Sequence, residues 1–256
     1  MMRLLVAFPL LLVALLPPPA QAATGDLAAP ATKEIAMELV SSAENSSLDW
    51  RAQFSYIEDI GDGRGYTAGI IGFCSGTGDM LRVVRAYTRA KPGNRLARFL
   101  PALRRVNDTD SHRGLGRPFV KAWRKAAHDP AFQRAQERER DTGYFRPAVR
   151  LAKSDGLGAL GQFIYYDAAV VHGVDGMKGV RRRALRSAAT PGAGGSETSY
   201  LEAFLDERVV EMKKEAPHEN VDRVELAQRR FLHEGNLGLT PPLRWSVYGD
   251  AYEILR

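Results

Sequence analysis

Two carboxylates, Glu44 and Asp62, are the side chains of this sequence best placed for acid–base chemistry. Glu44 follows a stretch with helical apolar spacing, Lys33–Ala43, whereas Asp62 lies among the glycines of Gly61–Gly65. We expect Glu44 in a packed setting, at a helix C-terminus whose dipole favours the protonated acid, and Asp62 on an open turn. Glycosidic bond cleavage requires two carboxyls kept in different protonation states.

The elements that must position this pair are mostly helices, with a small β element beside them. Glycine, threonine and β-branched residues over Gly61–Phe73 predict a short hairpin or sheet edge that turns at Asp62–Gly65. Trp50–Ile60 is predicted as a separate preceding segment. The sequence therefore predicts an α+β class, mainly α-helical. Further helices are expected over Met80–Ala90, Arg95–Val106, Phe119–Ala127, Pro130–Asp141, Leu157–His172, Glu197–Lys213 and Val221–His233.

An acidic residue, Asp167, interrupts the nearly all-apolar segment Leu157–His172. That segment predicts a buried central helix, in which an unpaired carboxylate would be prohibitively costly. We therefore expect Asp167 to have charged or hydrogen-bonding partners.

The formal net charge is +6, but the charges are unevenly distributed. Residues 34–79 contain eight acidic side chains against two basic ones, and residues 82–155 contain 19 basic against seven acidic. The acidic surroundings of the carboxylate pair would attract a cationic ligand, which argues against nucleic acid or a membrane as the partner. The alternative is that these acids merely lie on solvated helix faces.

The N-terminus has the pattern of a secretory signal. One basic residue, Arg3, precedes the apolar run Leu4–Leu16 and the A-x-A site Ala20–Ala22. We expect residues 1–22 to be a cleaved signal peptide and residues 23–256 to form one exported, soluble, monomeric domain. Cys74 is the single cysteine, so no intramolecular disulfide forms; we expect it to be buried, the alternative being a reactive thiol.

Other chemistries lack their sequence signals. The chain has neither a nucleotide-binding glycine loop nor a Gly-x-Ser-x-Gly elbow, and its histidines are not spaced as zinc ligands. We expect no metal and no cofactor. Near the pair, the Thr67 hydroxyl could hold a water, and Tyr56 could stack on a sugar ring. Arg64 could tune the base or contact substrate, or be a solvated turn charge.

Long runs of the sequence carry a family resemblance. Lys33–Ser47, Tyr56–Thr67 and Gly69–Asp79 resemble the bacterial secreted chitosanases of glycoside hydrolase family 46. Later segments agree with this resemblance, and together the runs cover essentially the whole mature chain: Ala159–Phe163, Tyr165–Asp167, Asn236–Leu237, Pro241–Leu243 and Tyr248–Asp250.

The resemblance implies a lysozyme-like fold whose two lobes flank a cleft, and endo-hydrolysis of chitosan, a β-1,4-linked glucosamine polymer. It implies Glu44 as general acid, Asp62 as the base of an inverting attack, and Thr67 as the residue that positions the water. Asp167, Arg208 and Arg223 match a network that supports the acid. Substrate contacts are implied for Asp79, Arg64, Tyr56, Glu58, His172 and Glu215.

Two other functions stay open on the sequence. One is a lysozyme-like hydrolase of peptidoglycan, and the other is a secreted polysaccharide-binding protein without catalysis. We also expect a loop at Gly173–Gly179, shorter than in well-known members of the family.

Overall fold

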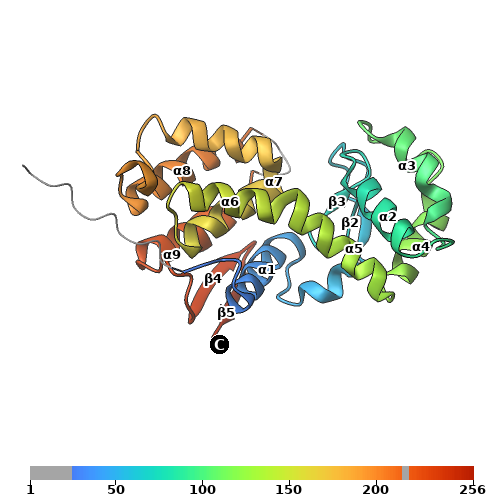
Figure 1. Ribbon diagram of the computed structural model, residues 1–256, viewed down its shortest axis with the longest axis horizontal. Helices are drawn as coiled ribbons and strands as arrows, with labels where there is room; N and C mark the ends of the chain where they lie inside the picture. The colour runs from blue at the N-terminus through green and yellow to red at the C-terminus, as the bar shows by residue number, and fades with distance from the viewer. Residues whose placement is uncertain (1–24, 215–218) are drawn as a thin grey trace, which may run out of the picture.

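The computed structural model describes residues 25–214 and 219–256, which form two lobes joined side by side (Figure 1). The large lobe contains α1, α6 to α9 and the hairpin β4–β5; the small lobe contains β1 to β3 and α2 to α5. The mainly helical α+β, lysozyme-like fold expected from the sequence is confirmed. The predicted signal peptide, residues 1–22, lies outside the described residues.

The large lobe is built around α7 (Ala159–Ala184), whose first half is buried on all sides as its apolar sequence predicts. Helices α6 (Arg146–Ser154) and α8 (Glu197–Met212) pack against it. Gly173 (φ 70°, ψ 166°) kinks α7 and the helix then resumes. The expectation of a loop at 173–179 was therefore wrong, because one glycine in the left-handed region interrupts the helix without ending it.

Helix α1 (Pro30–Asn45) presents Glu44 in its last turn and buries Ile35–Ala43 in the core. Ser46, in the left-handed conformation (φ 48°), ends the helix. A 3-10 helix, Trp50–Ser55, follows and connects α1 to the small lobe. The Asp49 side chain caps its start by accepting from the backbone N–H of Ala52. The predicted position of Glu44 at the end of a helix is confirmed.

The small lobe opens with an antiparallel sheet in the order β1 (Ile57–Asp59), β2 (Tyr66–Ala68), β3 (Phe73–Cys74). Glu58 pairs with Thr67, and Thr67 with Cys74. The turn 60–65 that carries Asp62 joins β1 to β2, as the sequence predicts. Its helices are α2 (Asp79–Ala90), α3 (Leu100–Val106, after the 3-10 turn Ala97–Phe99) and α4 (Gly116–Ala126).

Helix α5 (Pro130–Arg140) runs from the small lobe into the large one (Figure 1). It continues through a π-helical turn, Asp141–Phe145, directly into α6. Helix α6 was not predicted from the sequence, because Pro147 lies in its first turn and reads as a helix breaker there.

The C-terminal part begins with a π-helix, Arg223–Gln228, and α9 (Arg229–His233). The antiparallel hairpin β4 (Leu243–Val247) and β5 (Asp250–Ile254) then closes the large lobe beside α1. This hairpin was also missed, although Leu243, Trp245 and Val247 alternate with more exposed residues as a strand pattern requires. Among the described helices, none is long and apolar enough to cross a membrane.

Candidate active site

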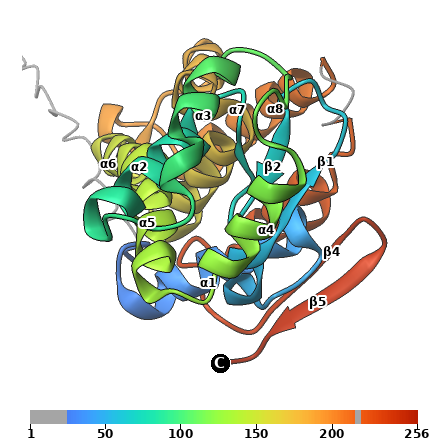
Figure 2. The same cartoon turned by 90° about the vertical axis from the view of Figure 1, so that its right-hand side faces the viewer.

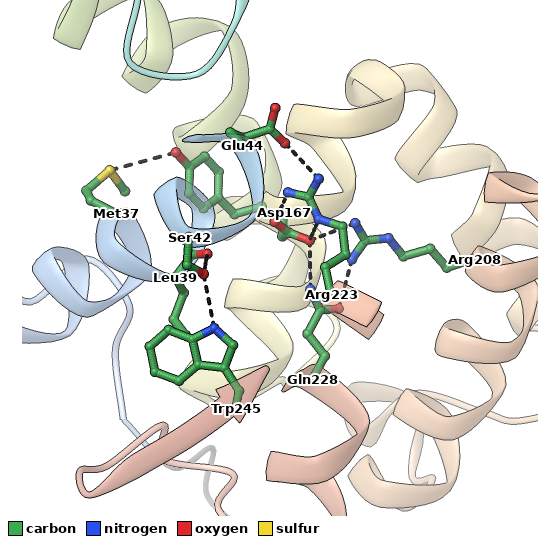
Figure 3. Close-up of polar contacts among 10 residues, drawn as sticks. Met37, Leu39, Ser42, Glu44, Asp167, Arg208, Arg223, Gln228 and Trp245 are labelled. Carbon is green, nitrogen blue, oxygen red and sulfur yellow. Dashed lines mark hydrogen bonds and ion pairs between the residues drawn. The ribbon is translucent and has the colours of Figure 1, made fainter. Parts of the chain in front are cut away.

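Glu44 lies at the junction of the lobes, where its carboxylate meets a cation from the distant C-terminal part. Arg223 Nη1 donates to Glu44 Oε1 at 2.7 Å. The Glu44 side chain is 24% exposed and that of Arg223 only 7%. One face of the carboxyl therefore stays open to solvent while the other contacts a buried guanidinium (Figure 3).

Behind Arg223 lies Asp167, in the middle of α7 and 1% exposed. It accepts from Arg223 Nη2 at 2.7 Å and Nε at 3.2 Å, from Arg208 Nη2 at 2.7 Å and from Gln228 Nε2 at 2.7 Å. Arg208 Nη1 in turn donates to Gln228 Oε1 at 2.8 Å. The buried acid thus has the charged partners that its burial demands, which confirms the expectation from the sequence.

The electrostatics of this network follow from burial and charge balance. Burial opposes ionisation of Asp167, but the positive charges of Arg223 and Arg208 hold the pKa of its carboxyl far below the usual range. Burial also lowers the pKa of Arg208, although Asp167 opposes that effect. With Glu44 ionised, the cluster holds two carboxylates and two guanidiniums and is electrically neutral.

Asp62 has a different and local partner. The backbone N–H of Arg64 donates to Asp62 Oδ1 at 3.0 Å, and the guanidinium Nε donates to Oδ2 at 2.8 Å. The Asp62 side chain is 3% exposed, because Arg64 folds back over it. The expected contrast was therefore wrong: Asp62, not Glu44, has the more enclosed side chain.

Thr67 and Cys74 face each other across the β2–β3 pair. Thr67 Oγ1 lies 3.5 Å from Cys74 Sγ, and Cys74 Sγ donates to the carbonyl oxygen of Gly72 at 3.2 Å. Burial and nearby negative charge raise the pKa of the Cys74 thiol to about 11. The prediction of a buried cysteine is confirmed, and a thiol held in its neutral form is a poor nucleophile.

A pocket of about 230 Å³ brings several predicted residues together. Glu44 and Arg223 line it from the large lobe, and Tyr56, Arg64 and Thr67 line it from the small lobe. The Tyr56 hydroxyl lies in the electrostatic field of three carboxylates. Burial and the negative charges of Glu58, Asp62 and Glu44 together raise its pKa. The remaining lining residues are Ala43, Asn45, Ile60, Ile71, Gly72, Val170, Val171 and Tyr248.

Asp79 lies away from this pocket and is 3% exposed. Its Oδ1 accepts from the backbone N–H of Cys74 and Met80 and from Thr77 Oγ1, and its Oδ2 accepts from the Tyr144 hydroxyl at 2.8 Å. Burial raises the pKa of Asp79. The structure does not present it as an exposed carboxylate for substrate; instead Asp79 fixes the loop between β3 and α2.

The other predicted contacts are spread around the site. Glu58 is exposed on β1 and accepts from the Tyr56 hydroxyl at 3.5 Å. His172 is half-buried in α7, where it contributes to a lowered pKa of Glu211. Neither residue lines the pocket beside Glu44. Glu215 lies outside the described residues.

Sequence reasoning missed Gln228 and Tyr248. Gln228 joins Arg208 to Asp167, and a single glutamine within a helical stretch gave no signal of this role. Tyr248 is 49% exposed, lines the pocket and has a left-handed backbone (φ 54°). Its backbone N–H donates to Asp222 at 3.0 Å. In the described ranges, no three His, Cys, Asp or Glu side chains gather as metal ligands.

Glu44 lines a pocket between the lobes of a mainly helical fold, and Asp62, which is not among the lining residues, is bonded to Arg64 in the pocket wall. Two carboxyls so placed beside a pocket fit the class of acid–base glycoside hydrolases. The chain belongs to glycosyl hydrolase family 46, whose family model matches residues 38–243. It is 62% identical over 229 residues to a chitosanase of Streptomyces sp. (strain N174), covering 88% of this chain and 82% of that protein. A chitosanase of Nocardioides sp. (strain N106) is 58% identical over the same shares of each chain.

Solved structures agree with this assignment. Chitosanase OU01, solved as a co-crystal with substrate, matches 91% of this chain and all of its own, with a TM-score of 0.89 and 56% sequence identity. The family resemblance and the fold expected from the sequence are thereby confirmed.

Proposed function

We propose that this hydrolase cleaves β-1,4 bonds between D-glucosamine units within chitosan, with inversion at the anomeric carbon. The observation that carries the proposal is the shared pocket, in which Glu44 and its partner Arg223 face Arg64 and Thr67 from the other lobe. The high identity to proteins named chitosanases supports the choice of polymer.

The charge around the pocket supports a cationic substrate. Glu58 and Asp59 are exposed on β1, and Glu44 lines the pocket. The two cations in the pocket wall, Arg64 and Arg223, are each paired with a carboxylate. At neutral pH the ammonium groups of glucosamine units would be attracted to this acidic surface. A neutral acetylated polymer would gain nothing from these charges.

In the proposed reaction Glu44 is the general acid. Its proton passes to the glycosidic oxygen as the bond to the anomeric carbon breaks, and the carboxylate that remains is stabilised by Arg223 Nη1. Asp167 and Arg208 hold Arg223 in that position. These three residues thus act through Glu44 and need not touch substrate.

Asp62 is the proposed base. It takes a proton from a water that attacks the opposite face of the sugar ring, so that the product has inverted configuration. Arg64 binds and orients the Asp62 carboxylate, and the Thr67 hydroxyl at the pocket wall is suited to position the water. The tight Arg64 contact limits which oxygen of Asp62 can reach that water.

Further substrate contacts are proposed for Arg64 and Tyr56 at the pocket, and for Glu58, His172 and Glu215 around it. Asp79 is proposed to affect substrate binding as well. Because its oxygens are already bonded, the structure favours an effect through the loop it fixes. We also propose that the protein is exported by its N-terminal signal and acts as a monomer, with no metal or cofactor.

The roles of the two carboxylates can be tested with Glu44→Gln and Asp62→Asn. Each should abolish most chitosan hydrolysis while thermal unfolding shows an intact fold. Asp206→Asn, whose side chain is 70% exposed on α8, is the matched control and should retain activity. Substantial hydrolysis by either active-site variant would refute the assignment.

The stereochemistry and the substrate need separate measurements. Proton NMR of the first products should show the inverted anomer, and the retained anomer would exclude a one-step attack. Turnover should be higher on fully deacetylated chitosan than on bacterial cell walls; the opposite preference would favour a peptidoglycan hydrolase. Chitosan binding without loss of viscosity would instead indicate a binding protein.

A further inference from the structure

The small lobe carries a set of basic side chains that lie outside the proposed active site. Three adjoining surface hollows, on α2, α4, α5 and the loop after α2, are lined by nine lysines and arginines and one acid. We call these nine residues the basic track: Arg89, Lys91, Arg95, Arg98, Arg117, Lys121, Lys125, Arg134 and Arg138.

The hollows lie next to one another, and two of them share lining residues. The first, about 370 Å³, lies between Arg98 and Arg117, and it shares Arg95 and Lys125 with the second, about 500 Å³. The third hollow, about 270 Å³, adjoins the second at the start of α5. Pro130 lines the second hollow, and the next residue, Ala131, lines the third together with Arg134. A long ligand could therefore follow the track from α4 across to α5.

The track has almost no internal compensation of charge. Its single acid, Asp129, pairs with Lys91 at 2.6 Å and accepts from the Tyr87 hydroxyl at 2.8 Å. Within the described ranges, the other eight cations make no ion pair. Elsewhere in the structure Arg183 and Arg229 each bind two or more carboxylates.

Exposed cations of one sign repel each other and would normally be interspersed with acids, so their convergence favours an anionic ligand. Six of the nine are arginines, whose planar guanidinium groups match phosphate oxygens in pairs. Arg98 is also oriented by stacking, with its guanidinium carbon 4.7 Å from the centre of the Phe99 ring. This restraint reduces the entropy lost on binding.

The chemistry of the track distinguishes among polyanions. Tyr87 and His128 carry the aromatic rings among its lining residues. Tyr87 is 4% exposed with its hydroxyl already bonded to Asp129, so His128 is the one exposed ring among them. A single exposed ring cannot stack on successive bases, and such stacking is what single-stranded nucleic acids use for tight binding. We propose that the basic track binds a linear chain of phosphate diesters without bases, of the poly(glycerol phosphate) kind.

The position of the track lets this binding coexist with catalysis. Figure 2 looks onto the small lobe, with α2 to α5 toward the reader, and Figure 1 shows α8 and α9 at the opposite end of the molecule. The pocket at Glu44 shares no residue with the three hollows. The protein could thus be held on an anionic polymer while the pocket at Glu44 accepts a cationic one.

The test measures binding of labelled poly(glycerol phosphate) by fluorescence anisotropy from ~50 to ~200 mM salt. The track variant combines Arg98→Gln, Arg117→Gln and Lys121→Gln. The control variant combines Arg150→Gln, Arg182→Gln and Arg186→Gln, exposed residues of the large lobe that remove the same net charge. Thermal unfolding should show that both variants fold like the wild type.

We expect the track variant to bind at least about tenfold more weakly than wild type at ~100 mM salt. The slope of log K against log salt concentration should be shallower by about 2, because each of the three lost phosphate contacts accounts for about 0.7. The control variant should stay within about twofold of wild type. Three results would overturn the proposal: equal losses in both variants, no wild-type binding at ~50 mM salt, or tighter track-dependent binding to double-stranded DNA of equal phosphate concentration.

Discussion

Asp167→Asn removes one charge from the buried network and keeps the shape of the side chain. In the wild type, Arg208 and Arg223 each donate to the Asp167 carboxylate at 2.7 Å. The change removes this negative charge and leaves the two guanidiniums facing each other. Loss of one partner from a buried ion pair costs about 3–5 kcal/mol, which for a chain of this size corresponds to a fall of about 6–20 °C in Tm. We expect a decrease in the free energy of unfolding of this order at pH 7.

The pH dependence gives the prediction a sign. The arginines hold the pKa of Asp167 below its ordinary value of 3.8, against the effect of burial. A group with a lowered folded-state pKa stabilises the protein above its unfolded pKa, and that stabilisation is lost as the pH falls toward the folded value. The stability difference between wild type and Asp167→Asn should therefore be constant above about pH 5 and shrink below pH 4, by about 1.4 kcal/mol per pH unit.

Urea unfolding at a series of pH values measures this difference. Asp206→Asn is the matched control, because Asp206 pairs with Arg229 at 2.8 Å but its side chain is 70% exposed. An exposed pair contributes about 0–1 kcal/mol, so the control should hardly change. A loss below about 1 kcal/mol for Asp167→Asn at pH 7, or a loss that does not shrink in acid, would refute an ionised Asp167 as the centre of the network.

Three further predictions concern single residues. Cys74, 2% exposed with its pKa raised to about 11, should resist thiol reagents at pH 8 until urea unfolds the protein; rapid labelling of the native protein would contradict its burial. Gly72→Ala should lower the stability by about 1 kcal/mol or more, because Gly72 has a φ of 71° and the new Cβ would lie 3.2 Å from Thr67 Cγ2. Tm and chitosan turnover should therefore fall together. Trp245→Phe should cost about 1–3 kcal/mol in urea unfolding, since it leaves a large buried gap and removes the 3.0 Å bond to Ser42; an unchanged midpoint would contradict this.

The sequence predicted most of the helices and the need for partners around Asp167, because both follow from rules that act on one segment. Apolar spacing identifies a buried helix, and the cost of an unpaired buried carboxylate requires a counter-charge. That Arg208 and Arg223 supply it came from the family resemblance. Gln228 could not be predicted, since its role depends on how the π-helix at 223–228 packs on α7.

The errors came from positions where local signals were weak or ambiguous. The kink at Gly173 resembled a helix end, because a glycine after a long apolar stretch is also typical of a C-cap. The hairpin at 243–254 is short and follows two prolines, so its alternation was easily missed. The exposure of Glu44 and Asp62 was misjudged because Arg64, two residues from Asp62, encloses it by a side-chain conformation that no periodicity reveals.

The two carboxylates therefore differ chiefly in the origin of their partners. Arg64 is bonded to Asp62 within one turn, so this pair moves as a unit with the β1–β2 connection. Arg223 reaches Glu44 across 179 residues of sequence, and its position depends on Asp167 in α7. Changes deep in the large lobe should consequently alter the environment of Glu44 and leave that of Asp62 unchanged. The proposed acid is sensitive to how the large lobe packs, whereas the proposed base depends on one local turn.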